Sequence, residues 1–254
     1  MRHLVLGFLC ILVLTGVAVA EPDHTGYDPD VWVNFEDNHA NRECTVYFYN
    51  DPLNEVIRFT GLGYSVTVGS NLSFANISSY DVVVIPLVGP GFIASYQADL
   101  EAYVGGGGGL YIHQPGAATG ALDYAPTGFG LYITAVGFCM PWDANAIVEP
   151  GHPTMDGLNA VDLPGRFDTI YTTNLGAGYT LIAQGTGTCA TDVHCAGGLY
   201  SNGKVFLDTS NLSANSADPG SNQYVINVVE WLCGGGQPTP AESSTWGTIK
   251  STYR

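Results

Sequence analysis

One uninterrupted apolar stretch constrains the fold of this chain more than any other feature. The segment YDVVVIPLVG, residues 80–89, carries four consecutive β-branched residues with no polar side chain among them. A strand with one solvent-exposed face alternates polar and apolar residues, whereas a strand that is covered on both faces is apolar along its length. The stretch therefore predicts a strand in the interior of a parallel sheet.

The residues after this stretch predict a helix and then a second buried strand. The segment 92–106 has apolar residues at helical spacing, and the glycine run 105–109 ends that helix and leads into the strand GLYIH. Before the stretch, residues 31–35 and 64–69 are strand-like, and residues 51–63 are helix-like. Strands and helices that alternate through glycine-rich joints predict a flavodoxin-like, doubly wound α/β fold. Its sheet is expected to be mostly parallel, with helices on both faces.

The second half of the chain is less regular. We expect the domain to close with a largely apolar helix over residues 222–234, after a series of strands, several of which are joined as hairpins. The strand-like segments are 129–138, 168–173, 179–185, 197–203 and 204–210.

The two ends of the chain differ in composition from its middle. Residues 1–20 begin with Arg2, continue as an apolar run and end on small residues, which is the pattern of a cleaved secretory signal peptide. Residues 237–254 contain two prolines in a polar run, typical of a linker and an exposed tail. We therefore expect one α/β domain over residues 21–236. The protein is expected to be secreted, periplasmic or displayed on the cell surface, with no membrane insertion after signal cleavage.

The chain is strongly acidic, with 7 Lys and Arg residues against 23 Asp and Glu and a formal net charge of −16. Removal of residues 1–20 takes away Arg2 and no acidic residue, so the charge becomes −17. A surface of this sign repels phosphate backbones and anionic lipid headgroups. We therefore expect no nucleic-acid partner, and interpret the acidity as a source of solubility outside the cell.

The cysteines allow two interpretations. Cys189 and Cys195 form the closest pair of the mature chain, in CATDVHC, and in an exported protein such a pair predicts a disulfide that closes a small loop. Alternatively, Cys189, His194 and Cys195 are zinc ligands, but no second pair of ligands with metal-site spacing accompanies them. We expect the disulfide and no metal.

The order of the segments resembles a known superfamily. The succession YDVVVIP, LEAYVGGGGGLYIH, GHPTMDGL, GKVFLDTSN and NQYVINVVEWL resembles the class I glutamine amidotransferase-like proteins. It is most similar to the branch of trehalose-utilisation-type (ThuA-like) proteins and related secreted bacterial domains. The last ten residues, TWGTIKSTYR, resemble endings of secreted bacterial proteins, which indicates a bacterial source. Because this fold hosts many activities and some members have none, the resemblance implies the fold and leaves the function open.

The resemblance also implies that a catalytic position has changed. Active members carry a nucleophilic cysteine in a Gly-Ile-Cys-x-Gly turn at the end of a strand. Residues 111–115, Tyr-Ile-His-Gln-Pro, match this turn, so His113 stands in place of the cysteine and Pro115 in place of a glycine. The segment that matches the family's His-Pro-Glu, residues 204–212, contains no histidine. The resemblance therefore implies that this chain lacks glutamine amidotransferase activity.

Candidate ligand-binding residues follow the predicted strands. Open α/β sheets bind ligands at the carboxyl ends of their strands, and a carboxylate, an imidazole and an aromatic ring there suit a sugar or another polyhydroxy ligand. The alternative interpretation places the acidic residues on a solvated loop and packs the tryptophan under a loop. The candidates are Glu36, Asp37, Gly89, His113, Gln114, Trp142 and Asp143.

His152 is a further candidate. It opens the segment HPTMDGL, which resembles a recurrent His-Pro-x-x-x-Gly-Leu segment of the family. Its ring can hold a turn through hydrogen bonds or contact a ligand. We favour the first role and keep His152 among the candidate ligand-binding residues.

Two functions remain open at this point. One is a secreted, non-catalytic domain that binds a small polar or carbohydrate ligand or supports an extracellular assembly. The other is a carbohydrate-active hydrolase or isomerase in which His113 is the general base and Asp208 or Glu36 orients its ring. No cofactor is expected, because the glycine run 105–109 precedes a strand and lacks the Lys and Ser or Thr of a phosphate loop.

Overall fold

The structure is a computed structural model, and all of its described residues belong to one compact unit spanning Asp37–Arg254. The predicted signal peptide, the tail, the strand predicted at 31–35 and most of the segment 129–138 lie outside the described residues. Within those residues, no helix has the length and hydrophobicity that a membrane crossing needs. The described residues are 43–89, 91–114, 121–130, 133, 144–165, 170–187, 190, 192–210, 212 and 218–234.

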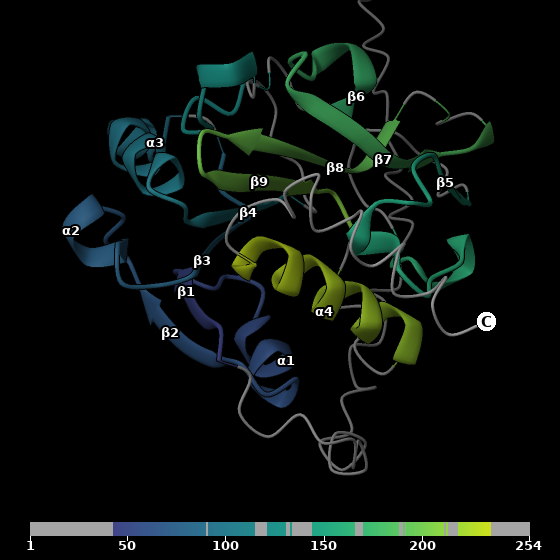
Figure 1. Cartoon of the computed structure of the whole chain (residues 1–254), viewed down its shortest axis with the longest axis horizontal. Helices are drawn as coiled ribbons and strands as arrows, with labels where there is room; N and C mark the ends of the chain where they lie inside the picture. The colour runs from purple at the N-terminus through teal and green to yellow at the C-terminus, as the bar shows by residue number, and fades with distance from the viewer. Residues whose placement is uncertain are drawn as a thin grey trace, which may run out of the picture. The chain divides into compact units, whose positions relative to one another are not determined.

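The described strands form one sheet in the order β2-β1-β3-β4-β9-β8-β7-β5, with β6 paired to β8 (Figure 1). The first five strands in this order are parallel to one another. Their order is that of a flavodoxin-like sheet, so the predicted fold class is confirmed. Their bounds are Ser65–Gly69 (β2), Thr45–Tyr49 (β1), Val82–Pro86 (β3), Gly109–His113 (β4) and Gly203–Asp208 (β9).

The remaining strands extend the sheet in antiparallel fashion. The sheet is therefore more mixed than the sequence predicts, because β7, β8 and β9 follow one another as hairpins instead of returning through helices. The bounds of this half are Asp192–Tyr200 (β8), Tyr179–Gly185 (β7), Asn145–Ile147 (β5) and Ile170–Tyr171 (β6).

Helices cover both faces of the parallel half (Figure 1). The helices α1 (Val56–Gly61) and α4 (Pro219–Cys233) contribute to one apolar cluster, and α2 (Phe74–Ile77) and α3 (Gln97–Gly105) contribute to the other. Short 3-10 turns complete the described structure. They are Ala94–Tyr96 (η3), Gly128–Gly130 (η4), Pro153–Met155 (η5), Ala160–Asp162 (η6) and Thr172–Asn174 (η7).

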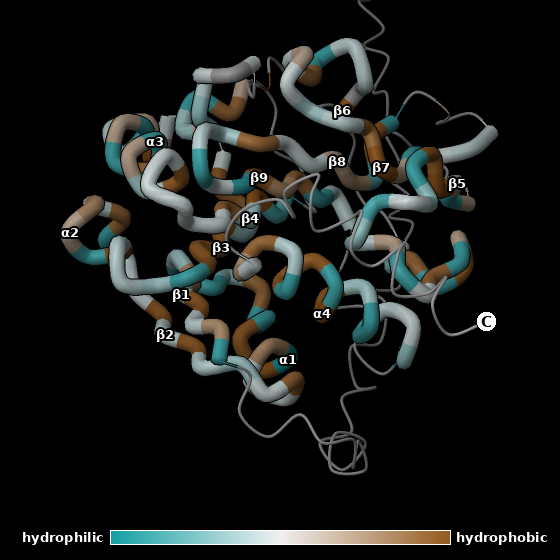
Figure 2. The backbone as a smooth tube through the Cα atoms, in the orientation of Figure 1, coloured by the Kyte–Doolittle hydropathy of each residue, from teal (hydrophilic) through white to brown (hydrophobic). Residues whose placement is uncertain are grey.

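The strand β3 shows why its sequence is apolar throughout. Successive side chains of a strand point to opposite faces. Val82 and Val84 therefore pack with α1 and α4, whereas Val83 and Ile85 pack with α2 and α3. All four side chains are fully buried, and Figure 2 shows β3 as hydrophobic. The sequence prediction of a strand covered on both faces is thus confirmed.

Candidate functional site

The carboxyl ends of the parallel strands meet around His113. This residue ends β4 and pairs in register with Pro86 at the end of β3 and Asp208 at the end of β9. Because the strands are parallel, the loops that follow β1, β3, β4 and β9 start from the same edge of the sheet. The prediction that Tyr111 to His113 form a strand terminus is confirmed, and Pro115 lies outside the described residues.

Both nitrogens of the His113 ring are occupied. The ring is fully buried, with Nδ1 2.8 Å from Glu55 Oε2 and Nε2 2.6 Å from Ser210 O. A carbonyl oxygen only accepts hydrogen bonds, so Nε2–H donates to Ser210, and Nδ1–H donates to the ionised carboxylate. Burial by itself lowers the pKa of His113, but the Glu55 charge and hydrogen bond, with Asp208 and the Ser210 carbonyl, raise it above its ordinary value. These surroundings therefore favour the imidazolium form of the ring.

Glu55 reaches this place because of the loop that precedes α1. Three residues of this loop, Asn50, Asp51 and Asn54, have positive φ values of 62°, 37° and 55°, a conformation that Asn and Asp adopt more readily than most residues. The Asp51 carboxylate accepts the backbone N–H groups of Glu55, at 2.8 Å, and of Val56, at 3.2 Å. This bonding closes the loop and starts the helix, so the Glu55 side chain is 1% exposed beside His113.

Glu55 is the residue that the sequence prediction missed. The prediction named Asp208 or Glu36 as the carboxylate that orients the ring, and the structure gives this role to Glu55. The run TVYFY at 45–49 is the signal that would have found it, because a strand there puts residues 50–55 at the carboxyl edge. Glu36 and Asp37 lie outside the described residues.

Asp208 binds two other neighbours of the cluster. The Tyr111 hydroxyl donates to Asp208 Oδ2 at 2.6 Å, and the Ser210 N–H donates to Asp208 Oδ1 at 2.7 Å. Burial, the Asp208 charge and the hydrogen bond to Asp208 raise the pKa of Tyr111 well above its ordinary value, so its hydroxyl remains a donor. Asp208 thus fixes the backbone at Ser210, whose carbonyl holds His113.

Arg58 supplies a second buried cation to the same region. Its guanidinium donates to Asn222 Oδ1, to the Leu212 carbonyl and to Ser221 Oγ. Burial lowers its pKa to about 10, which still leaves it charged at neutral pH, and the nearby Tyr111, Glu55 and Asp208 oppose this shift. Two carboxylates, Glu55 and Asp208, therefore face two cations, which compensates the cost of burying each charge alone.

Two oxygen atoms beside His113 have no hydrogen-bond partner among the described residues. They are Glu55 Oε1 and Ser210 Oγ, and both residues are at most 2% exposed. Buried polar atoms in folded proteins are nearly always paired, so such exceptions require an explanation. A ligand hydroxyl that reached these atoms would satisfy them.

The remaining candidate residues at this edge lie in different surroundings or outside the described residues. Gln114 is buried, and its N–H donates to the Asp208 carbonyl at 2.7 Å, so its backbone continues the sheet. Gly89 is half-buried and lies under Phe92, since a Cβ placed at Gly89 would be 3.6 Å from the Phe92 ring. Trp142 and Asp143 lie outside the described residues.

His152 lies in a turn, as the favoured interpretation predicts. Its Nδ1 is 2.8 Å from Thr154 Oγ1 and accepts the Thr154 N–H at 3.3 Å, which caps η5. Its ring packs against Trp231 of α4, with the ring centres 5.0 Å apart. Burial and the Lys204 charge lower its pKa to about 4, so the ring is neutral at physiological pH. These contacts give His152 a structural role in the described part of the chain.

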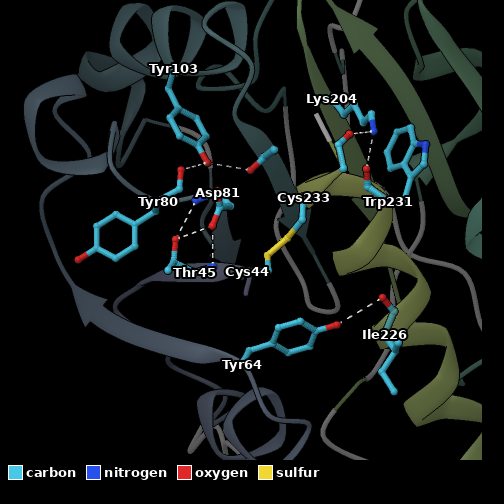
Figure 3. The surroundings of a disulfide bond; sticks show 12 residues. Cys44, Thr45, Tyr64, Tyr80, Asp81, Tyr103, Lys204, Ile226, Trp231 and Cys233 are labelled. Carbon is cyan, nitrogen blue, oxygen red and sulfur yellow. Dashed lines mark hydrogen bonds between the residues drawn. A yellow bond between two sulfur atoms is a disulfide. The ribbon is translucent and has the colours of Figure 1, made fainter. Parts of the chain in front are cut away.

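The predicted pairing of the cysteines is wrong. Cys195 is buried with a free thiol, and the structure instead joins Cys44 to Cys233 by a disulfide (Figure 3). Cys195 lies within β8 opposite Asp208, in the apolar cluster under α4, and burial raises its thiol pKa well above the ordinary value. Cys189 lies outside the described residues.

Among the described residues, no group of three or more His, Cys, Asp and Glu side chains has the arrangement of a metal site. The alternative zinc interpretation of Cys189, His194 and Cys195 includes Cys189, which the described residues do not contain.

Comparison with known proteins supports the fold and no further assignment. No protein-family model matches the chain, and no curated protein matches its sequence. A cytoplasmic protein of Salmonella typhimurium matches with a TM-score of 0.55 and 13% identity, over 76% of this chain and 100% of that chain. A second cytoplasmic protein, from Salmonella typhimurium LT2, matches with a TM-score of 0.50 and 12% identity, over 74% and 99% of the two chains.

A ThuA-like protein of Parabacteroides merdae also matches. It has a TM-score of 0.48 and 13% identity, and the match covers 75% of this chain and 89% of that chain. Identities this low say nothing of activity, because the same fold carries unrelated functions. The two Salmonella matches show that this chain is similar to those proteins in fold.

Proposed function

We propose that this protein is a secreted, non-catalytic domain of amidotransferase-like architecture that binds a small polar or carbohydrate ligand. The observation that carries the proposal is the state of His113, the residue at the position of the family's nucleophile. Its two ring nitrogens donate to Glu55 and to Ser210, and its side chain has no exposed surface.

A histidine in this state is a poor general base. A general base needs a free lone pair within hydrogen-bond distance of a water molecule or a substrate hydroxyl. The imidazolium of His113 has no lone pair to offer while it is bonded to Glu55 and Ser210. The arrangement instead suits a buried ion pair that ties the start of α1 to the ends of β4 and β9. The buried, doubly bonded ring of His113 favours the binding function over the hydrolase or isomerase.

Secretion is supported by two separate features. Residues 1–20 have the pattern of a signal peptide. The Cys44–Cys233 disulfide fits an oxidising compartment, because cytosolic reductants keep most protein thiols reduced. Both features are consistent with a periplasmic, cell-surface or extracellular location.

The carboxyl edge offers an exposed aromatic ring as well as polar groups. Phe92, which follows β3, is 82% exposed. The loop before it is held in place, because the Gly91 N–H lies 3.0 and 3.1 Å from the two Asp123 carboxylate oxygens. An aromatic face near hydrogen-bonding groups suits the apolar face and the hydroxyls of a sugar. We therefore assign Phe92 to the ligand-binding surface.

A glycan array with the purified mature protein tests this proposal. We expect Phe92→Ala to weaken binding of any captured glycan at least fivefold, a loss of about 1 kcal/mol. Leu199→Ala is the matched control, since Leu199 is 41% exposed and pairs in β8 with Lys204 near the start of β9, at the amino ends of the parallel strands. Equal binding by the two variants would remove Phe92 from the site.

Enzyme assays decide between the two functions. The wild-type protein is expected to leave glycosidase and sugar-isomerase substrates unchanged. Turnover that disappears in His113→Gln, while the circular dichroism spectrum and glycan binding persist, would establish the enzyme and overturn the non-catalytic assignment. Measurement of binding in the same variant separates a loss of catalysis from a loss of fold.

A further inference from the structure

The loop that follows β3 begins with a leucine in an unusual backbone conformation. Leu87 has a φ of 48°, in the left-handed region. The Cβ of an L-amino acid crowds the backbone there, so glycine, asparagine and aspartate adopt this region far more often than bulky aliphatic residues do. The other described non-glycine residues with positive φ are Asn50, Asp51, Asn54 and Ser201. Leu87 is therefore the one large apolar residue in this conformation among the described residues.

Neighbouring contacts hold Leu87 in this conformation. Its backbone N–H donates to the His113 carbonyl at 2.7 Å, directly after the last pair of β3 with β4. The next side chain, Val88, is 9% exposed and packs in the apolar cluster of α2 and α3. Because both contacts fix the chain at this turn, the strained conformation persists in the folded protein.

Core packing does not account for the leucine side chain. Leu87 is half-buried, and within the described part of the chain it belongs to neither of the two apolar clusters. A glycine at residue 87 would adopt the same φ without steric cost, and an asparagine would adopt it at a smaller cost than leucine. Strained residues that their surroundings hold in place cluster at functional sites, so the side chain of Leu87 calls for a functional explanation.

Leu87 lies at the carboxyl edge of the sheet, close to Phe92. The Phe92 ring lies over Gly89, since a Cβ placed at Gly89 would be 3.6 Å from that ring. Gly89 follows Leu87 by two residues, and two residues of chain span at most about 7 Å. The half-buried leucine and the 82% exposed phenylalanine therefore stand near each other on the loop after β3.

We propose that Leu87 is a further ligand-binding residue, and that its side chain packs beside Phe92 against the apolar face of a sugar ring. This assignment rests on the proposed glycan-binding function and narrows its ligand to a carbohydrate. An aliphatic and an aromatic side chain complement the C–H groups of a sugar ring, while polar groups of the same edge suit its hydroxyls. The strain at Leu87 is then a loss of stability that accompanies a binding role.

Two substitutions at this position separate backbone strain from ligand contact. Leu87→Asn introduces a residue that adopts positive φ more readily, and we expect the melting temperature to rise by about 2 °C. Leu87→Ala keeps the strain and removes most of the side chain, so its melting temperature should stay within about 2 °C of the wild-type value. Both variants should bind the glycan that the wild-type protein captures on the array about fivefold more weakly, as measured by titration calorimetry.

Ser201→Asn is the matched control. Ser201 has a φ of 53° in the hairpin between β8 and β9, at the amino ends of the parallel strands. The substitution therefore relieves the same kind of strain away from the carboxyl edge. We expect its melting temperature to rise by about the same 2 °C, and its affinity for the captured glycan to equal that of the wild-type protein.

The stability and binding measurements can each overturn the proposal. A Leu87→Asn melting temperature below the wild-type value, or a fall of more than about 2 °C in Leu87→Ala, would make Leu87 a packing residue. Unchanged affinity in either variant, while Phe92→Ala binds more weakly, would reject the role of Leu87 and leave the glycan-binding function standing. An array on which the wild-type protein captures no glycan would reject both.

Discussion

The ring of His113 shows how a single buried residue can be held charged. Its two nitrogens face acceptors, a carboxylate on one side and a backbone carbonyl on the other. The loss of either acceptor leaves a buried donor unpaired, and the loss of the ring leaves a buried carboxylate unpaired. The pair therefore contributes little to stability when intact, and its disruption is costly.

Replacement of the carboxylate tests this asymmetry. We expect Glu55→Gln to lower the free energy of unfolding by about 3 kcal/mol, because the imidazolium loses its counter-charge in a buried setting. Urea unfolding followed by fluorescence at pH 7 measures the change. Glu149→Gln removes a carboxylate from an exposed position, where the change should stay within about 0.5 kcal/mol. If the two variants changed the free energy of unfolding by similar amounts, loss of the Glu55 carboxylate beside His113 would not be destabilising as expected.

The same pair makes stability depend on pH. The folded-state pKa of His113 is raised above its ordinary value of 6.5, so the folded state binds the proton more tightly than the unfolded state. The contribution is therefore fully present below about pH 6.5 and is lost as the pH rises through the folded pKa. We expect the urea midpoint to fall as the pH rises from 7 to about 9, and to fall less in Glu55→Gln.

His152, which is half-buried, does not affect this measurement above pH 7. The pKa of His152 is lowered to about 4, so its effect on stability lies between pH 4 and its ordinary pKa of 6.5. A urea midpoint that stays constant from pH 7 upward in the wild-type protein would contradict the assignment of a raised His113 pKa.

At the scale of elements, the hairpin between β8 and β9 depends on one glycine. Ser201 in the turn has a φ of 53°, and Gly203 follows as the first residue of β9. A Cβ at Gly203 would clash with the carbonyl oxygens of Val104 and Gly108. Both of these are backbone atoms, which side-chain rotation cannot move away. The end of α3 and the hairpin can therefore approach each other only if residue 203 has no side chain.

Alanine substitution at this glycine should be costly. We expect Gly203→Ala to lower the free energy of unfolding by about 2 kcal/mol or more, since backbone must shift to admit the methyl group. Gly151→Ala is the matched control, because a Cβ at Gly151 meets nothing within 4 Å. Thermal unfolding of both variants provides the measurement, and a Gly203→Ala melting temperature equal to that of the control would refute the clash.

Elements with a strong local pattern were predictable, and short ones were not. The strands β2, β3, β4 and β7 and the helices α3 and α4 lie within or close to the predicted ranges. The sequence prediction missed β1, α2 and β5, which span only five, four and three residues. Periodicity needs several residues to become visible, so elements this short are specified mainly by their neighbours in the sheet. Because the prediction placed the first strand at 31–35 and missed β1, it looked for the carboxylate that orients His113 at Glu36 and overlooked Glu55.

At the scale of the whole molecule, the Cys44–Cys233 disulfide ties the start of β1 to the end of α4. The two cysteines are 189 residues apart in sequence, so the bond closes nearly the entire described fold into a loop. A cross-link of this length restricts the unfolded chain strongly, by about 5 kcal/mol on the chain-entropy estimate.

Removal of this cross-link should destabilise the protein without changing its fold. We expect Cys44→Ser/Cys233→Ser to lower the free energy of unfolding by about 2 to 5 kcal/mol, with an unchanged circular dichroism spectrum. Urea unfolding with and without a reductant gives the measurement. The reductant should bring the wild-type midpoint to that of the variant and leave the variant unaffected, even though the variant keeps Cys195. A variant as stable as the oxidised wild type would contradict the prediction.

The sequence by itself determined the fold class and the strand that ends on His113, and it favoured a turn role for His152 without excluding ligand contact. These follow from hydrophobic periods, glycine positions and hydrogen bonds between near neighbours, all of which are local. Only the tertiary structure decided that Glu55 is the partner of His113, 58 residues away, and that Cys44 pairs with Cys233 across 189 residues. The physical reason is that strand order and helix packing set which distant residues meet, and a one-dimensional pattern does not contain that order.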